Sequence, residues 1–86
     1  MFTITTIRFK IEGDSLVFAN TESNGLYPYD NAVDEIKRVH QDAKSGDRLD
    51  HNIETLNKLK NYDRKTIEVI SSDNTKQWFM YINKIS

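Results

Sequence analysis

Histidine is the residue type of this 86-residue chain best suited to acid–base or metal chemistry, and the chain has two of them. His40 falls on the apolar flank of a predicted helix, and the residue four positions later is Lys44 rather than a carboxylate. A catalytic histidine needs an orienting partner, and a tetrahedral metal site needs more ligands than two histidines supply. We therefore expect a partly buried, hydrogen-bonded His40, a solvated His51 and no metal site. A small enzyme centred on His40 is the least favoured alternative.

Cysteine, serine and glycine give no sign of nucleophilic or phosphate chemistry. The chain has no cysteine, which excludes disulfides and thiolate metal sites, and its serines fall in predicted turns and strand ends without a flanking motif. The three glycines are not spaced as in the phosphate-binding motif GxxxxGKS or GxxxxGKT. The sequence therefore predicts a non-enzymatic protein that binds no cofactor.

Large apolar side chains occupy both faces of the predicted strand Trp78–Ile82. Successive strand side chains point to opposite sides of a sheet. Trp78 and Met80 therefore face one way, and Phe79 and Tyr81 face the other. A small sheet that is covered by helices on one side buries only one of these faces. The second face predicts contact with another molecule, either a partner protein or a second copy of the chain.

The remaining periodicity predicts the elements that hold this strand in place. In chain order they are a strand over Thr3–Glu12, a strand over Leu16–Asn20, a polar loop over Thr21–Tyr29, a helix capped by Asp30 or Asn31 and ended by Gly46, a second helix capped by Asp47, and strands over Thr66–Ser71 and Gln77–Ile85. The predicted fold class is α+β. We expect a single domain over residues 1–86, with a four-stranded, mainly antiparallel sheet, the order ββααββ, and an antiparallel helical hairpin packed on one face.

Strand alternation also predicts which side chains form the core. The residues assigned to the helix-covered face are Ile7, Phe9, Ile11, Leu16, Phe18, Ile67, Val69, Trp78, Met80 and Ile82. The residues assigned to the opposite, outer face are Thr6, Arg8, Lys10, Val17, Ala19, Glu68, Ile70, Phe79 and Tyr81. A rival register turns Phe79, Tyr81 and Ile85 inward. Shielding of the outer face by the polar loop is the structural alternative to a binding surface.

Acidic residues define a second candidate surface. Twelve basic and thirteen acidic residues leave a net charge of −1, which argues against a general binder of the nucleic-acid backbone. Three tight turns meet at one end of the predicted sheet, where the charged residues are Glu12, Asp14, Asp47, Asp50, Asp73, Lys44 and Arg48. This turn end is a candidate dock for a partner with a basic surface, although a solvated rim of caps and turns is the simpler interpretation.

Tyr27 and Tyr29, on either side of Pro28, are candidate interface anchors because tyrosine offers a large contact area with a polar tip. The alternative is packing beside the start of the helix, as in a hydrophobic staple. The sequence leaves both interpretations open for Tyr27 and favours packing for Tyr29.

These patterns together predict a small protein-binding module, an inhibitor, adaptor or accessory factor that binds another protein or forms a homodimer. Ile, Lys and Asn make up 25 of the 86 residues, a bias that is typical of AT-rich genes and so of many phages and mobile elements. No apolar run is long enough for a membrane helix, so we expect a cytoplasmic protein without membrane contact. The alternative function is single-stranded nucleic-acid binding, with bases stacked on Phe79 and Tyr81 beside Arg8 and Lys10.

Overall fold

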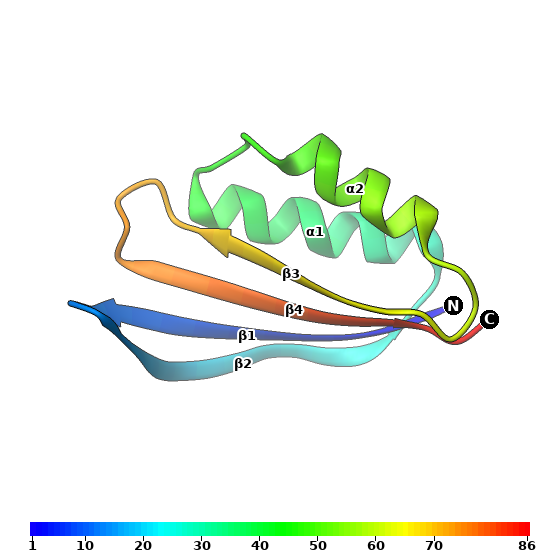
Figure 1. The fold of residues 1–86 in the computed structure, drawn as a ribbon, viewed down its shortest axis with the longest axis horizontal. Coiled ribbons are helices and arrows are strands. Elements are labelled where there is room, and N and C mark those ends of the chain that lie inside the picture. The colour runs from blue at the N-terminus through cyan, green and yellow to red at the C-terminus, as the bar shows by residue number, and fades with distance from the viewer.

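A computed structural model describes all residues 1–86 and contains four strands and two helices (Figure 1). In chain order they are β1 (Phe2–Glu12), β2 (Ser15–Tyr27), α1 (Tyr29–Ala43), α2 (Leu49–Lys58), β3 (Arg64–Ile70) and β4 (Lys76–Lys84). The strands form one antiparallel sheet of order β2-β1-β4-β3, and both helices lie on the same face of it. The predicted α+β fold and its ββααββ order are confirmed.

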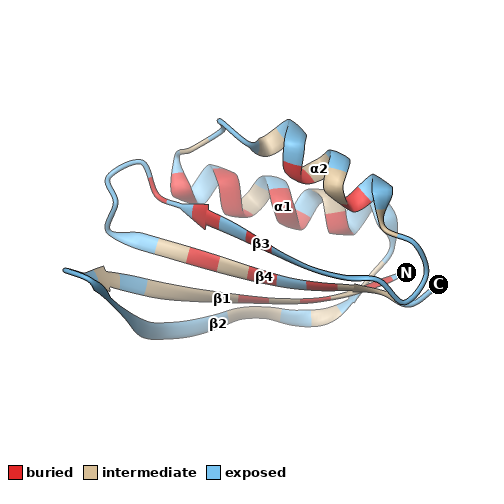
Figure 2. Cartoon of the chain, viewed as in Figure 1, coloured by how far each residue is buried: buried red, intermediate tan, exposed pale blue.

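The hydrophobic core lies between the helices and the sheet face that they cover, as the buried positions in Figure 2 show. In α1 the buried apolar residues recur every three or four positions, which places them in one stripe that faces the sheet. The core residues are Phe2, Ile4, Ala32, Ile36, Val39, Ala43, Leu56, Ile67, Val69, Trp78, Met80 and Ile82. The prediction that Trp78 and Met80 of β4 face the core is correct, because both are fully buried. The alternative register, which turned Tyr81 inward, is wrong, because Tyr81 is 43% exposed.

The inward face predicted for the first hairpin is wrong. In the β1–β4 ladder, Ile4 lies opposite Ile82, and Ile7 lies opposite Phe79. Directly opposite residues share a face of the sheet, so the even-numbered positions of β1 face the helices and the odd-numbered positions face outward. The residues wrongly assigned to the core are Ile7, Phe9, Ile11, Leu16 and Phe18. For the same reason the prediction wrongly placed four residues on the outer face, although the structure has them on the side that faces the helices: Thr6, Arg8, Lys10 and Val17.

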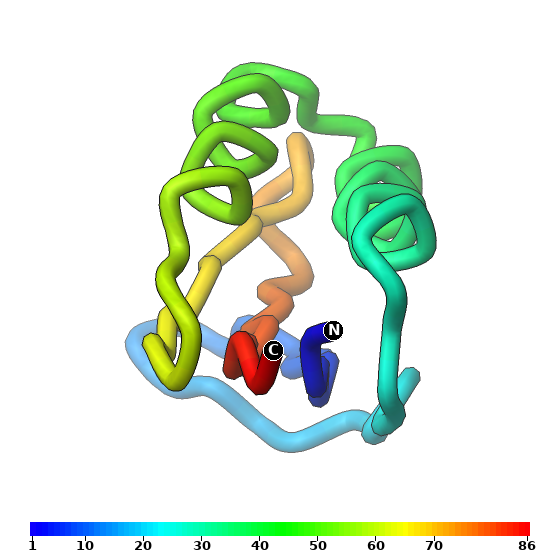
Figure 3. The backbone as a smooth tube through the Cα atoms, turned by 90° about the vertical axis from the view of Figure 1, so that its right-hand side faces the viewer, coloured from blue at the N-terminus to red at the C-terminus, as the bar shows by residue number.

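β2 is longer than predicted, since the segment predicted as a polar loop is mostly strand and pairs with β1. Two register shifts interrupt this pairing, and they leave Ala19 and Glu22 without a direct partner in β1. Bulges break the alternation of side chains, which explains why this strand has the sequence pattern of a loop. Seen end-on in Figure 3, β2 crosses beneath the other strands, on the side away from the helices.

α1 begins earlier than predicted. Its first residue is Tyr29, so neither Asp30 nor Asn31 caps it. The N-cap residue is Pro28, which has no side-chain acceptor, and its backbone carbonyl accepts from the Ala32 N–H at 2.9 Å. The fixed φ of proline, here −61°, suits this entry into the helix, and Asp30 in the first turn still matches the positive end of the helix dipole.

The connection between the helices also differs from the prediction. α1 ends where Lys44 adopts the left-handed conformation (φ 53°), a position that was expected for Gly46. α2 follows Arg48, so Asp47 is not its cap. The two helices still form the predicted hairpin, because the turn between them is made by the backbone and does not depend on a capping side chain. Neither helix is long and apolar enough to cross a membrane.

Candidate functional site

Four aromatic side chains from three strands form a cluster on the sheet face opposite the helices. We call it the outer aromatic cluster, and its members are Phe9, Phe18, Phe79 and Tyr81. The Phe9 ring lies edge-on to Phe18 and to Phe79, with centroid distances of 6.1 and 5.3 Å. Phe79 and Tyr81 stack at 6.3 Å with an interplanar angle of 15°. These are favourable aromatic geometries, so the rings support one another.

The register of the sheet explains why these rings meet. Phe9 of β1 lies directly opposite Phe18 of β2. Phe79 of β4 lies opposite Ile7, one diagonal step from Phe9, and long side chains reach across such a diagonal. Phe79 and Tyr81 alternate on β4, which places both on this face. The cluster is thus fixed by the pairing of β1 with both of its neighbours.

Two of the four rings of the outer aromatic cluster are exposed to solvent, and the other two, Phe9 and Phe79, are partly buried. Phe18 is 60% exposed and Tyr81 is 43% exposed, and the exposed side chains of Leu16 and Ile70 add apolar surface to the same face. By contrast, Trp78 on the opposite face of β4 is 1% exposed. Shielding by the segment Thr21–Tyr29 was the alternative to a binding surface, and most of this segment is part of β2. An exposed apolar patch of this kind is typical of an interaction site.

Arg8 and Lys10, the predicted basic neighbours of the cluster, lie on the other side of the sheet. Arg8 is directly opposite Trp78, and its Nη1 lies 3.4 Å from Glu22 Oε2. Lys10 shares this face by strand alternation, and its Nζ lies 3.2 Å from Glu12 Oε1. The prediction that these two cations flank the aromatic rings is wrong, because it followed from the reversed face of β1.

A polar network that the sequence did not predict joins β2 to α1 through Arg38. Arg38 donates from Nε to Glu35 Oε1 at 2.8 Å, and from Nη1 to Asp42 Oδ2 at 2.8 Å and Glu22 Oε1 at 3.3 Å. Trp78 Nε1 also donates to Glu22 Oε1, at 2.8 Å. The helical spacing of Glu35, Arg38 and Asp42 is a readable signal for ion pairs. The position of Glu22 beside Arg38 depends on a bulge in β2, which no pattern in the sequence predicts.

Glu35 is the buried carboxylate of this network. Burial raises the pKa of Glu35, but three hydrogen-bond donors and the charge of Arg38 outweigh this effect and hold the pKa below its ordinary value. The donors are Arg38, Ser23 at 2.6 Å and Thr6 at 2.8 Å. Hydrogen bonding to Glu35 raises the pKa of Arg38 against the opposing effect of burial. The network is therefore ionised, and its groups stabilise the fold.

His40 is buried and hydrogen-bonded, as predicted. Its Nδ1 lies 2.6 Å from the Ser45 carbonyl oxygen, and its Nε2 lies 2.9 Å from Asn52 Nδ2. A carbonyl only accepts and an amide nitrogen only donates, so Nδ1–H donates to Ser45 and Nε2 accepts from Asn52. Both ring nitrogens thus hold the connection between α1 and α2, whereas His51 is exposed.

We expect His40→Ala to lower the free energy of unfolding by about 2 kcal/mol, because it leaves buried partners unpaired. Asn52→Ala should give a loss of similar size, and the double variant should lose less than the sum, since the two residues share one hydrogen bond. Urea unfolding measures all three. The exposed His51→Ala is the matched control and should stay within about 0.5 kcal/mol of wild type. Equal stability of the two histidine variants would contradict the role given to His40.

Tyr27 and Tyr29 lie apart from the outer aromatic cluster. Tyr27 is partly buried and packs against the hydrophobic core. Tyr29 opens α1 and is 44% exposed, and its hydroxyl donates to Asn57 Oδ1 of α2. Packing therefore accounts for Tyr27, and Tyr29 ties the two helices together.

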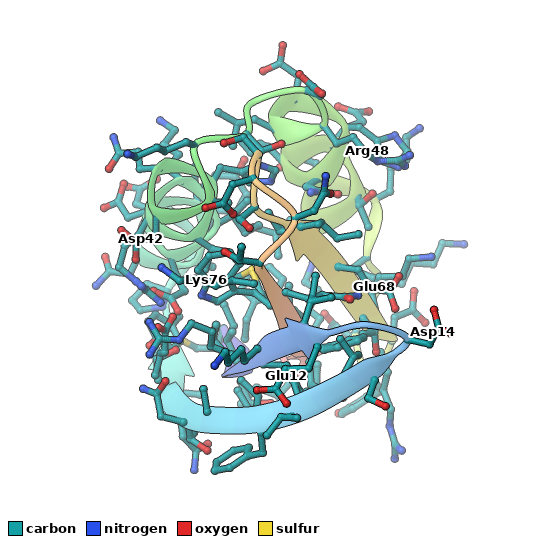
Figure 4. All side chains as sticks on the ribbon, turned by 90° about the vertical axis from the view of Figure 1, so that its left-hand side faces the viewer. Glu12, Asp14, Asp42, Arg48, Glu68 and Lys76 are labelled. Atoms are coloured by element: carbon teal, nitrogen blue, oxygen red, sulfur yellow. The ribbon has the colours of Figure 1, made fainter.

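The turn end contains charged residues that were not predicted there. Figure 4 looks onto this end and shows Lys76 among its acidic residues, with Asp14 at the tip of the first hairpin and Arg48 on the helical side. Lys10 also belongs here, since its ammonium group pairs with Glu12. Lys10 and Lys76 oppose the negative charge that was expected to attract a basic partner, whereas Asp42, at the same end, adds to it.

Asp73 serves the turn between β3 and β4. Its Oδ1 accepts from the Thr75 hydroxyl at 2.6 Å and from the Ser71 hydroxyl at 2.7 Å. Hydrogen bonds from the Thr75 side chain, the Ser71 side chain and the Thr75 backbone lower the pKa of Asp73 to about 2. Asp47 lies in a separate connection, between the helices. These acids occur at different turns, and turn geometry accounts for Asp73.

No group of three or more histidine, aspartate or glutamate side chains is placed so that it could hold a metal ion. Comparison of the chain with protein-family models, curated proteins and solved structures finds no match.

Proposed function

We propose that this chain is a small protein-binding module whose contact surface is the outer aromatic cluster. The observation that carries the proposal is the unequal burial of the two faces of β4. Trp78 and Met80 fill the core against the helices, while Tyr81 stays 43% exposed on the other face. Exposed aromatic rings held in a fixed arrangement are more than the fold needs for its own core.

The composition of this face fits a protein partner. The buried centre of a protein interface is rich in aromatic side chains and poor in charged ones. Around the cluster, Glu68 lies opposite Phe79 and Arg64 lies one diagonal step from Tyr81, while Arg8 and Lys10 face the other way. A single-stranded nucleic-acid platform combines stacking rings with cations that follow the backbone. The geometry therefore favours a protein partner over the nucleic-acid alternative.

The mechanism that we propose is steric. Aromatic anchors that are already ordered by their neighbours lose little side-chain freedom on binding, which leaves more of the contact energy for affinity. The module would cover a surface of its partner and so act as an inhibitor, adaptor or accessory factor. A second copy of the chain is one such partner.

We expect Phe18→Asp to weaken partner binding by at least about thirtyfold, since removal of an aromatic anchor typically costs about 2 kcal/mol or more. Phe18 is 60% exposed, so the fold should tolerate the change. Tyr81→Asp is the second test variant. The matched control is Tyr62→Asp, because Tyr62 is aromatic, 82% exposed and outside the cluster.

Affinity capture from the source cells with quantitative mass spectrometry compares the wild type with these variants. The proposal expects a captured protein that both cluster variants lose and the Tyr62→Asp control retains. Sedimentation over a concentration series gives the same comparison for a second copy. Equal capture by all four proteins, together with a constant monomer mass, overturns the proposal.

A further inference from the structure

β3 is an edge strand whose outward backbone groups have no partner in the chain. Within its ladder with β4, Ser71 N–H donates to Lys76 O, and Lys84 N–H donates to Asp63 O. Bonded pairs alternate along an antiparallel ladder, so the even-numbered residues of β3 direct N–H and C=O away from the sheet. These residues are Arg64, Thr66, Glu68 and Ile70. The backbone bonds of turns, loops and caps do not involve them.

This edge forms one wall of a groove of about 530 Å³. An unbroken run of β3 residues, Lys65–Ile70, lines the groove. The facing wall consists of Arg48, which precedes α2, and of His51, Asn52 and Thr55 of α2. α2 lies above β3 along much of the strand (Figure 1). Because consecutive residues line it, the groove follows the backbone of β3, and its length suits an extended segment of about 20 Å.

The two edges of the sheet differ in how they are protected. β2 is interrupted by two bulges, a device that natural proteins use to prevent pairing at an edge. β3 pairs with β4 without a register shift and contains neither proline nor glycine. β3 is therefore the regular edge of the sheet, and the charge that protects it is the inward-facing Lys65, which an acidic strand neutralises.

The α2 side of the groove carries more basic than acidic charge. Lys65 faces this side, because it lies opposite the core residue Ile82. Arg48 and His51 line the α2 wall, and Asp47 is the acid beside them. Glu68 points to the outer side of the sheet, opposite Phe79. Side chains of an added strand also alternate, so those that face α2 meet Lys65 and Arg48.

We infer that the groove between β3 and α2 binds an extended segment of a partner protein, which adds to the sheet as a fifth strand and directs acidic side chains toward Lys65 and Arg48. Backbone hydrogen bonds to the unpaired groups of β3 give affinity, and the alternating side chains give specificity. None of the four rings of the outer aromatic cluster lines this groove, so either site can hold while the other fails.

Two short blocked peptides test the inference, one alternating threonine with glutamate and the other alternating threonine with lysine. The acidic peptide should shift the amide resonances of Thr66 and Glu68 and slow their hydrogen exchange. The basic peptide should bind about fivefold more weakly, the size expected for a partly solvated charge contact. An acidic peptide that is N-methylated at its threonines should not bind, because the threonine N–H groups are directed at β3 when the glutamates face α2.

Lys65→Glu should reverse the preference between the two peptides, whereas Lys37→Glu on α1, outside the groove, should leave it unchanged. Phe18→Asp should also leave peptide binding unchanged, which separates this site from the proposed function. Unshifted β3 amides, or equal binding of the N-methylated peptide, overturn the inference. Protection of these amides that rises with the concentration of the protein alone also overturns it, since a second copy then fills the groove.

Discussion

Trp78→Ala should lower the free energy of unfolding by about 4 kcal/mol, within the range measured for large-to-small substitutions in cores. Trp78 is 1% exposed and is among the largest fully buried side chains of the protein. Its removal leaves a cavity between β4 and the helices and takes away the Nε1–H that donates to Glu22. A domain of this size has only a few kcal/mol of net stability, so most of it should be lost.

Trp78→Phe separates the two causes. Phenylalanine keeps most of the buried ring but lacks the donor, so the expected loss is about 2 kcal/mol, the size of a hydrogen bond to a charged group. Urea unfolding followed by circular dichroism measures both variants. The matched control is Tyr62→Ala, since Tyr62 is 82% exposed, and it should change stability by less than about 0.5 kcal/mol. If Trp78→Ala unfolds at the same urea concentration as this control, the inward face of β4 is assigned wrongly.

Glu35→Gln should lower the free energy of unfolding by about 2 kcal/mol at neutral pH, because the amide removes the charge that Arg38 pairs with and presents an N–H₂ group to donors. The pKa of Glu35 is lower in the folded protein than its ordinary value of 4.5. Its ionised form therefore stabilises the fold fully above about pH 4.5, and this stabilisation is lost as the pH falls through the folded-state pKa.

The urea midpoint measured from pH 7 to pH 2 tests this dependence. The wild type should lose stability below about pH 4.5, and Glu35→Gln should show a flatter profile over the same range. Asp73, whose pKa is about 2 rather than 3.8, adds a separate loss at lower pH that Asp73→Asn removes. Glu54→Gln is the control, since Glu54 is exposed on α2 and lies 3.7 Å from Lys58. Parallel profiles for wild type and Glu35→Gln would show that Glu35 carries no pH-dependent stability.

The sequence predicts β4 and the helical stripes well because their patterns are strong. Trp78 and Met80 on one face of β4, like the apolar stripe of α1, are large or regularly spaced residues that only a core accommodates. The face of β1 that meets the helices could not be predicted in this way. The more regular series of alternating apolar residues in β1, which includes Ile7 and Phe9, lies on the outer face. A pattern shows that a face is apolar, but not which neighbour it meets.

The helix-facing side of β1 shows why the prediction failed. Thr6 is fully buried, yet its hydroxyl donates to Glu35 of α1. Arg8 faces the same side and pairs with Glu22, which a bulge in β2 brings into reach. Polar residues are accepted there because partners distant in the sequence satisfy them, and no local pattern contains that information.

The members of the outer aromatic cluster were only partly predicted for the same reason. Phe79 and Tyr81 were placed correctly, since β4 was oriented correctly. Phe9 and Phe18 were assigned to the core, and Arg8 was assigned to the face that they occupy. The reversed faces of β1 and β2 thus explain why a small patch with basic neighbours was predicted where the structure has a larger apolar patch, and they change the kind of partner that fits it.

The strand order β2-β1-β4-β3 also fixes when the sheet can be completed during synthesis. A chain that leaves the ribosome N-terminus first can form the hairpin of β1 and β2 early. The other side of β1 has no neighbour until Lys76–Lys84 has emerged, and β3 has no neighbour at all before then. Both helices are made before the strand that carries Trp78 against them. The helix-covered face of the sheet therefore stays incomplete until β4 has emerged, and the apolar surfaces that are exposed in that interval favour aggregation.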